Sequence, residues 1–163
     1  MIAVSTDLER ARGVAAAVLD PEVPVLTIDD LGVLRDVTVD DSGRVEVTVT
    51  PTYSGCPAMD VIRADIEKAL HDNGFDRVEV RTTLSPAWTT DWMSAEGKRK
   101  LEAYGIAPPS PRGAGPVAVA LSVRCPRCGS IDTRELSRFG STACKALWAC
   151  NACLEPFDHF KAI

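Results

Sequence analysis

The stretch RVEVTVTPTYSGCPAMDVI, residues 44–62, decides the fold of the first part of the chain. Its first half alternates valine with polar residues, which is the period-two pattern of a half-buried strand. Pro57 suits the first position of a helix, because the N–H that proline lacks would be unpaired there in any case. The stretch therefore predicts a strand, a tight loop and a helix over about residues 57–70, with Cys56 at the cap of that helix.

The residues around this stretch predict a small α+β domain. STDLERARGVAAAVLD, residues 5–20, has helical spacing and a cap at Ser5 or Thr6, and Pro21 prevents the helix from continuing. A second strand, GVLRDVTVD, precedes an Asp-Ser-Gly hairpin turn, and a third strand is expected in FDRVEVRTTL. SAEGKRKLEAYGI predicts a final helix capped by Ser94. The order α-β-β-α-β-α favours a small mixed sheet with its helices on one face.

The chain of 163 residues divides into two modules. Proline and glycine are concentrated in residues 108–116, a composition typical of a linker. We therefore expect an α+β domain over 1–107, this linker, and a C-terminal module over 117–163. The C-terminal module offers four candidate strands but few apolar residues, so it needs a disulfide or a metal to hold it. The candidate strands are VAVALSVRC, DTRELSRF, KALWAC and FDHFKAI.

Two C-x-x-C pairs could supply the ligands of such a metal. The pairs are Cys125 with Cys128, and Cys150 with Cys153. A two-residue spacing lets both thiolates of a turn point at one ion, and two such turns complete a tetrahedral site with four sulfur ligands. The pattern predicts a structural metal site, with zinc as the usual ion and an iron–sulfur cluster as the alternative.

Cys144 and His159 lie beside this set but are not needed by it. A fifth cysteine has no place in a tetrahedral site, so Cys144 is either a small buried side chain or an additional functional thiol. His159 is expected to be a surface or packed histidine. The aromatic residues Trp148, Phe157 and Phe160 either fill the small core or, if exposed, present a docking surface.

Cys56 has two interpretations on local geometry alone. The N–H groups of the first helical turn favour a negative charge, which would make its sulfur a better nucleophile and metal ligand. Gly55 allows a sharp turn beside the sulfur, and Thr52 and Ser54 could donate hydrogen bonds to it. The other interpretation is a cysteine packed under the helix. A catalytic role is poorly supported, because Ala58 stands where a redox pair would have its second cysteine.

Composition restricts the class of protein. The net charge is −5 and basic residues do not alternate with aromatic ones, so nucleic-acid binding is poorly supported, although ribbon modules often have that role. The apolar run VAVAL, residues 117–121, is far shorter than a membrane helix. The N-terminus lacks the pattern of a secretory signal. We expect a cytoplasmic protein, in which cysteines usually serve metal or redox chemistry.

These motifs carry a resemblance to known families. LDPEVPVLTIDDLGVLRDV (19–37) and VTPTYSGCPAMDVI (49–62) resemble the α+β domain of the iron–sulfur assembly family. With SPAWTTDWMSAEGKRKLEAYGIAPP (85–109) and FGSTACKALWACNACLEPFDHFKAI (139–163), the chain is similar over nearly its full length to the D-subunit family of the phenylacetyl-CoA epoxidases of phenylacetate catabolism.

The resemblance implies a non-catalytic accessory role in maturing the epoxidase, by assisting iron–sulfur or iron-site assembly. The implied partners are the oxygenase and reductase subunits or other iron–sulfur clients. The family's functional cysteine corresponds to Cys56, and its acidic stretch to Asp20 and Glu22. One thiolate cannot hold a cluster alone, so a transient cluster would need ligands from a homodimer mate, from Cys144 or from the client. The alternatives are a structural or electron-transfer subunit of the epoxidase, and a zinc-ribbon nucleic-acid binder.

Overall fold

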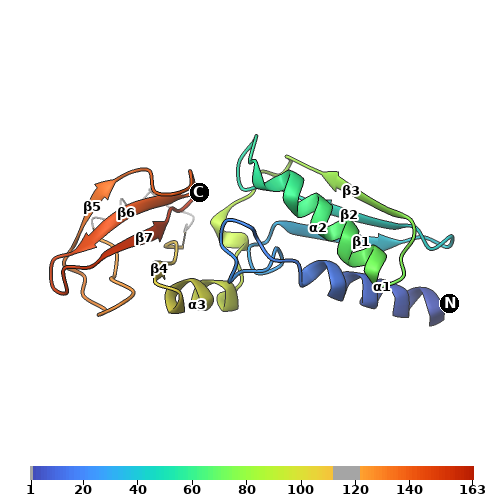
Figure 1. Ribbon diagram of the computed structural model, residues 1–163, viewed down its shortest axis with the longest axis horizontal. Coiled ribbons are helices and arrows are strands. Elements are labelled where there is room, and N and C mark those ends of the chain that lie inside the picture. Colours follow the sequence, from blue (N-terminus) through green and yellow to red (C-terminus); the bar gives the residue numbers. More distant parts are fainter. Residues whose placement is uncertain (1, 112–121) are drawn as a thin grey trace. The chain divides into compact units, whose positions relative to one another are not determined.

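The computed structural model describes residues 2–111 and 122–163 and consists of two compact units, Met1–Trp88 and Thr89–Ile163 (Figure 1). The predicted linker over 108–116 lies outside the described residues from 112 onward. Across the described ranges, no helix is long and apolar enough to cross a membrane.

The first unit has the predicted α+β class and the order α-β-β-α-β, but the final helix predicted for this module, within residues 94–106, belongs to the second unit. Its sheet has the order β1-β2-β3, with β1 antiparallel and β3 parallel to the central strand β2. The elements are α1 (Ile2–Ala16), β1 (Leu34–Val39), β2 (Val45–Val49), α2 (Ala58–Asp72) and β3 (Val78–Thr82).

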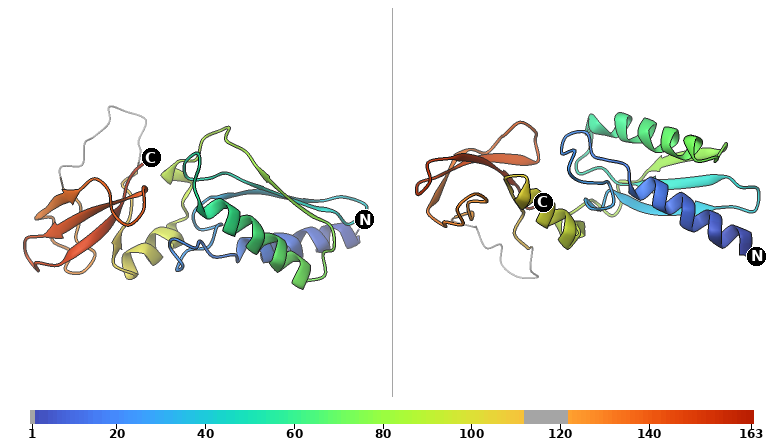
Figure 2. Two further views of the ribbon diagram at one scale, coloured as in Figure 1. Left: turned by 45° about the horizontal axis from the view of Figure 1, so that its top comes forward. Right: turned by 60° about the horizontal axis from the view of Figure 1, so that its bottom comes forward.

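The alternation in β2 determines which face of the sheet is covered. Val45, Val47 and Val49 are completely buried, and both helices pack on the face to which they point (Figure 2). The opposite face carries the polar partners of the alternation. There Arg81 lies 3.2 Å from Glu46 and 3.1 Å from Glu79. Helix α2 contributes Ile62, Ile66 and Leu70 to the buried layer.

The N-terminal helix differs from its prediction at both ends. It begins at Ile2, so the predicted caps Ser5 and Thr6 lie inside it, and it ends at Ala16 rather than near residue 20. The helix ends early because the chain turns at Val18, whose N–H donates to the carbonyl of Ala15.

Three connections meet at one end of the first sheet. The N–H of Thr50, just after β2, donates to the carbonyl of Val33 at 2.9 Å. After β3, the buried indole of Trp88 donates to the carbonyl of Leu31, also at 2.9 Å. The loop that contains Cys56 therefore leaves the sheet beside the loop that precedes β1.

The second unit is built on a four-stranded sheet of order β4-β7-β6-β5. Ser94 caps its helix as predicted, by accepting a hydrogen bond from the N–H of Gly97 at 2.9 Å. Of the strand predicted at VAVALSVRC, residues 117–121 lie outside the described residues and 122–125 form no strand. The elements are η1 (Thr90–Trp92), α3 (Ala95–Ala103), β4 (Ile106–Ala107), β5 (Thr133–Ser137), β6 (Lys145–Cys150) and β7 (Pro156–Phe160).

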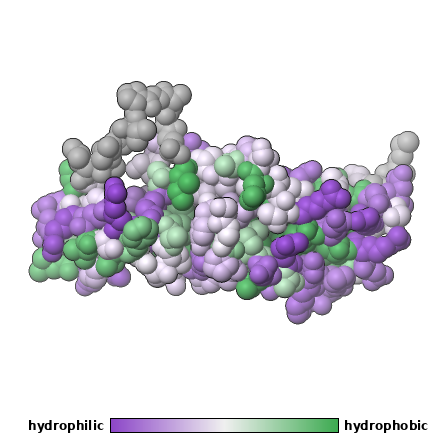
Figure 3. All heavy atoms as spheres, turned by 90° about the horizontal axis from the view of Figure 1, so that it is seen from above, coloured by the Kyte–Doolittle hydropathy of each residue, from purple (hydrophilic) through white to green (hydrophobic). Residues whose placement is uncertain are grey.

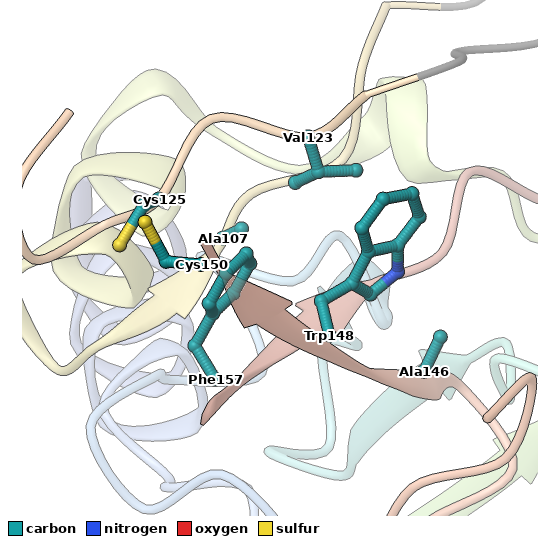
Figure 4. Close-up of a cluster of buried hydrophobic side chains, with 7 residues drawn as sticks. All are labelled: Ala107, Val123, Cys125, Ala146, Trp148, Cys150 and Phe157. Atoms are coloured by element: carbon teal, nitrogen blue, oxygen red, sulfur yellow. The ribbon is translucent and has the colours of Figure 1, made fainter. Parts of the chain in front are cut away.

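A small apolar cluster forms the core of this unit (Figure 4). Trp148 and Phe157 are its largest members, and both are buried, as is Phe160 elsewhere in the unit. The three aromatic residues fill the interior rather than presenting a docking surface. The remaining members of the cluster are Ala107, Val123, Cys125, Ala146 and Cys150.

Candidate functional site: a four-sulfur centre and a loop cysteine

The structure brings the two C-x-x-C pairs together. The sulfurs of Cys125 and Cys153 are 3.8 Å apart, and those of Cys128 and Cys150 are 3.5 Å apart. All four sulfurs lie within 4.8 Å of one another. In a tetrahedral site with Zn–S bonds of about 2.3 Å, neighbouring sulfurs are about 3.8 Å apart. The four cysteines therefore form a metal-binding group of the right size for one tetrahedral ion.

Tight backbone turns hold the four sulfurs in place. In the first pair, the N–H of Gly129 donates to the carbonyl of Cys125 at 2.9 Å, and Gly129 has a φ of 78°, which suits glycine. In the second pair, the N–H of Cys153 lies 3.5 Å from the sulfur of Cys150. A backbone N–H aimed at the sulfur is the usual second contact of a thiolate ligand.

The surroundings of two of the thiols move their pKa values in opposite directions. The N–H of Cys153 is the main cause that lowers the pKa of Cys150, to about 7. Although the N–H of Glu155 lowers it, burial and the neighbouring sulfurs raise the pKa of Cys153 to about 12. A cation bound among the sulfurs would balance the negative charge of thiolate ligands.

Cys144 and His159 both lie outside the four-sulfur group. Cys144 is buried, and its sulfur is 3.0 Å from the hydroxyl of Thr142. His159 is packed in the interior with its ring edge-to-face on Trp148, at 6.0 Å between the ring centroids. The structure thus places His159 in the interior. Of the two alternatives expected from the sequence, a surface or a packed histidine, the second is confirmed.

The buried histidine should make stability depend on pH. Burial lowers the pKa of His159 from 6.5 to about 4, so between these values the unfolded chain binds the extra proton and the folded chain does not. Stability conferred by the neutral ring is present above pH 6.5 and is lost as the pH falls towards 4. Relative to a His159→Phe variant, the wild type should lose about 1 kcal/mol of unfolding free energy between pH 7 and pH 5.5. Denaturant titrations of both proteins test this, and equal losses would contradict it.

Cys56 lies in the loop between β2 and α2. Its side chain is partly exposed, and Gly55 before it has a φ of 80°, a left-handed conformation that favours glycine. Helix α2 is regular from Ala58, one residue later than predicted, and Pro57 stands at its cap with helical dihedral angles. The carbonyl of Cys56 accepts from the N–H of Met59 at 3.2 Å, but the predicted cap position of Cys56 is wrong, because the cysteine lies one residue before the cap.

The supporting residues predicted around Cys56 have different surroundings. Ser54 is exposed and Thr52 is partly exposed, both in the same loop as the cysteine. Asp20 is buried in the neighbouring loop, where its carboxylate accepts from the N–H groups of Glu22 and Val23, each at 2.8 Å. Asp20 thus shapes the loop that precedes β1.

Two features of this end of the sheet were missed from the sequence. Thr27 and Asp30 cap each other reciprocally: the hydroxyl of Thr27 accepts from the N–H of Asp30 at 3.0 Å, and the carboxylate of Asp30 accepts from the N–H of Thr27 at 3.1 Å. The spacing T-x-x-D is a capping-box pattern and could have revealed them. The hydroxyl of Thr50 is buried without a hydrogen-bond partner in the described structure, and no sequence signal marks it.

Hydrophilic and hydrophobic side chains share the visible surface of the first unit. Figure 3 shows hydrophilic side chains over much of that unit, in the right half of the view, with hydrophobic ones among them. In the second unit, on the left, hydrophobic and strongly hydrophilic groups alternate. Single exposed apolar residues of this kind are normal on a protein surface.

Known proteins resemble both parts of the chain. A family model described as "Iron-sulfur cluster assembly protein" matches residues 9–81, and one described as "PaaD zinc beta ribbon domain" matches residues 109–161. The crystal structure of a domain of unknown function, DUF59, from Bacillus anthracis has a TM-score of 0.57 at 30% identity, covering 61% of this chain and 95% of that one. This agrees with the α+β fold predicted for the first module.

Two curated relatives cover different lengths of the chain. The Fe-S protein maturation auxiliary factor YitW of Bacillus subtilis is 37% identical over 94 residues, 57% of this chain and 91% of that protein. The Escherichia coli K12 protein named as the D subunit of a 1,2-phenylacetyl-CoA epoxidase is 51% identical over 144 residues, 88% of this chain and 86% of its own length. The chain therefore belongs to the family of the phenylacetyl-CoA epoxidase D subunits, in which an iron–sulfur assembly domain is joined to a zinc β ribbon.

Proposed function

We propose that this protein is a non-catalytic maturation factor for a phenylacetyl-CoA epoxidase and that it assists iron–sulfur or iron-site assembly in the cytoplasm. The observation that carries the proposal is the pairing of two modules in one chain. The first is similar to proteins named Fe-S protein maturation auxiliary factors, and the whole chain is similar to a protein named as an epoxidase subunit.

Cys56 is the proposed working thiol of the first unit. It is partly exposed just before α2, where the helix dipole favours negative charge. Thr52, Ser54, Gly55 and Pro57 shape the loop around it. Asp20 and Glu22 belong to the neighbouring loop, which Asp20 stabilises from within. The cargo, iron or an iron–sulfur cluster, would be held by Cys56 together with ligands from a client protein or from a second copy of the chain.

The four-cysteine group has a structural role in this proposal. Two of its cysteines, Cys125 and Cys150, are buried among the core side chains of the ribbon, so an ion bound there would hold strands and knuckles together. Zinc is the proposed ion, because it favours closed tetrahedral sites with four sulfurs and has no redox chemistry of its own. Cys144 is assigned a packing role, because its side chain is buried.

The experiment is a deletion of the gene in the organism that makes the protein. The epoxidase oxygenase and reductase are purified from the deletion strain and from the same strain carrying the gene on a plasmid. Iron per oxygenase and cluster per reductase should fall on deletion and be restored by the plasmid. Full metal loading together with full epoxidase activity in the deletion strain would show that the proposal is wrong.

A second candidate function is a non-catalytic structural or electron-transfer component of the assembled epoxidase. The name of the Escherichia coli relative favours it, since that protein is named as a subunit. Affinity purification of the oxygenase separates the two candidates. A structural component remains in stoichiometric amounts through gel filtration, whereas a maturation factor is present only in trace amounts once the oxygenase holds its metal.

A further inference from the structure

The second unit contains a cavity that lies apart from the sulfurs of the metal-binding group. Its volume is about 450 Å³, which is in the range of small-molecule sites. The lining comes from three strands and the segments beside them, with apolar groups from Val123, Phe139 and Ala146. Polar and charged groups come from Glu135, Arg138, Trp148, His159 and Lys161.

Two buried nitrogens in this lining lack hydrogen-bond partners in the described structure. They are Nε1 of Trp148 and Nε2 of His159, and their residues are only 6% and 9% exposed. Leaving a buried polar atom without a partner is costly, so two of them in the lining of one cavity require an explanation. Figure 4 shows the indole of Trp148 with its nitrogen turned away from the sulfurs of Cys125 and Cys150. The metal site therefore does not account for it.

The chemistry of the lining points to an acceptor. The indole N–H can only donate, and the Nε2 of a neutral imidazole donates in one of its two tautomers. Two cationic side chains, Arg138 and Lys161, line the same cavity. Glu135 is 3.9 Å from Arg138, and Lys161 lies 4.8 Å from the centre of the Phe139 ring. A group with two acceptor oxygens and a negative charge satisfies both nitrogens and the excess of positive charge.

We propose that this cavity is a binding site for an organic carboxylate, whose head group accepts hydrogen bonds from Trp148 and His159 while its apolar part packs against Val123, Phe139 and Ala146. The carboxylate is carried either by a small free acid or by an acidic side chain of a bound polypeptide. This site is independent of the proposed maturation role, since it contains neither Cys56 nor the four clustered cysteines.

The indole N–H signals of the three tryptophans provide the test, because each gives a separate ¹⁵N–¹H peak. The metal-loaded full chain is titrated with butyrate, with benzoate, and with an end-blocked peptide that contains one glutamate. The Trp148 peak should shift in a saturable manner. The Trp88 peak should stay fixed, because that indole already donates to Leu31. A shift with the free acids identifies a small-molecule site, and a shift with the peptide alone identifies a polypeptide ligand. A Trp148 peak that moves with none of the three overturns the proposal.

Neutral analogues and two variants make the test specific. Butyramide and benzamide should bind at least about tenfold more weakly than the acids, because charged acceptors form stronger hydrogen bonds. A His159→Phe variant, read at the Trp148 peak, should bind the acids about tenfold more weakly. A Trp148→Phe variant should also bind the acids about tenfold more weakly. Its binding is measured from the signals of the backbone amides that line the cavity. Full metal content in both variants shows that the ribbon is folded. Amides that bind as tightly as the acids, or variants that bind as tightly as the wild type, also overturn the proposal.

Discussion

Replacing Cys128 by serine is expected to release the metal from the second unit and to unfold its sheet, while the first unit stays folded. Cys128 is exposed, so the substitution removes almost no apolar packing. It does remove one of four ligands that lie within 4.8 Å of one another. In small modules the free energy of metal binding is folding free energy, about 10–16 kcal/mol for comparable zinc sites. The three sulfurs left behind cannot replace that contribution.

Hydrogen exchange and metal analysis measure this outcome. In Cys128→Ser, the amides of β6 and β7 should lose their protection, and the metal content should fall from one ion per chain to a small fraction. The indole signal of Trp88, in the first unit, should be unchanged. Cys144→Ala is the matched control, because it removes a buried cysteine of the same unit that lies outside the ligand set. A Cys128→Ser protein that keeps one ion per chain and wild-type protection would refute a structural role for the metal.

Features that depend on residues close together in the sequence could be predicted from the sequence. The alternation in residues 45–49 predicted β2 and the face that it buries, because a strand with one covered face must repeat every second residue. The C-x-x-C spacing predicted the four-sulfur group, because that spacing places both thiols of a turn on the same side. Ser94 was predicted as a cap from its position before a helical run.

Features that depend on contacts between distant residues could not be predicted. After the early end of α1, Leu19 forms a bridge with Thr27, which no local pattern indicates. The unpaired nitrogens of Trp148 and His159 become visible only when β6 and β7 lie side by side. The surroundings of Asp20 likewise follow from a loop conformation, which composition does not specify. The family resemblance implied a role for Asp20 and Glu22 but could not indicate that the carboxylate of Asp20 accepts hydrogen bonds within its own loop.

The proposed role of Cys56 predicts a large loss of function with little loss of stability. In the deletion strain, a plasmid that encodes Cys56→Ala should leave iron and cluster loading of the epoxidase at the level of the empty plasmid. The sulfur is the only group of that side chain able to bind iron or an iron–sulfur cluster, and alanine has none. The residue is partly exposed in a loop, so the unfolding free energy should change by less than about 1 kcal/mol.

Two controls separate the thiol of Cys56 from general effects of substitution. Asp41→Ala alters an exposed residue in the turn between β1 and β2 of the same unit and should restore loading fully, because a surface substitution away from the sulfur changes little. Cys144→Ala removes a buried thiol of the other unit and should also restore loading. If Cys144→Ala does not restore iron and cluster loading although the variant folds and keeps its metal, Cys144 supplies a ligand to the cargo. If Cys56→Ala restores loading as well as the wild type does, the cargo is not held by Cys56, and the function of the first unit must reside in another part of its surface.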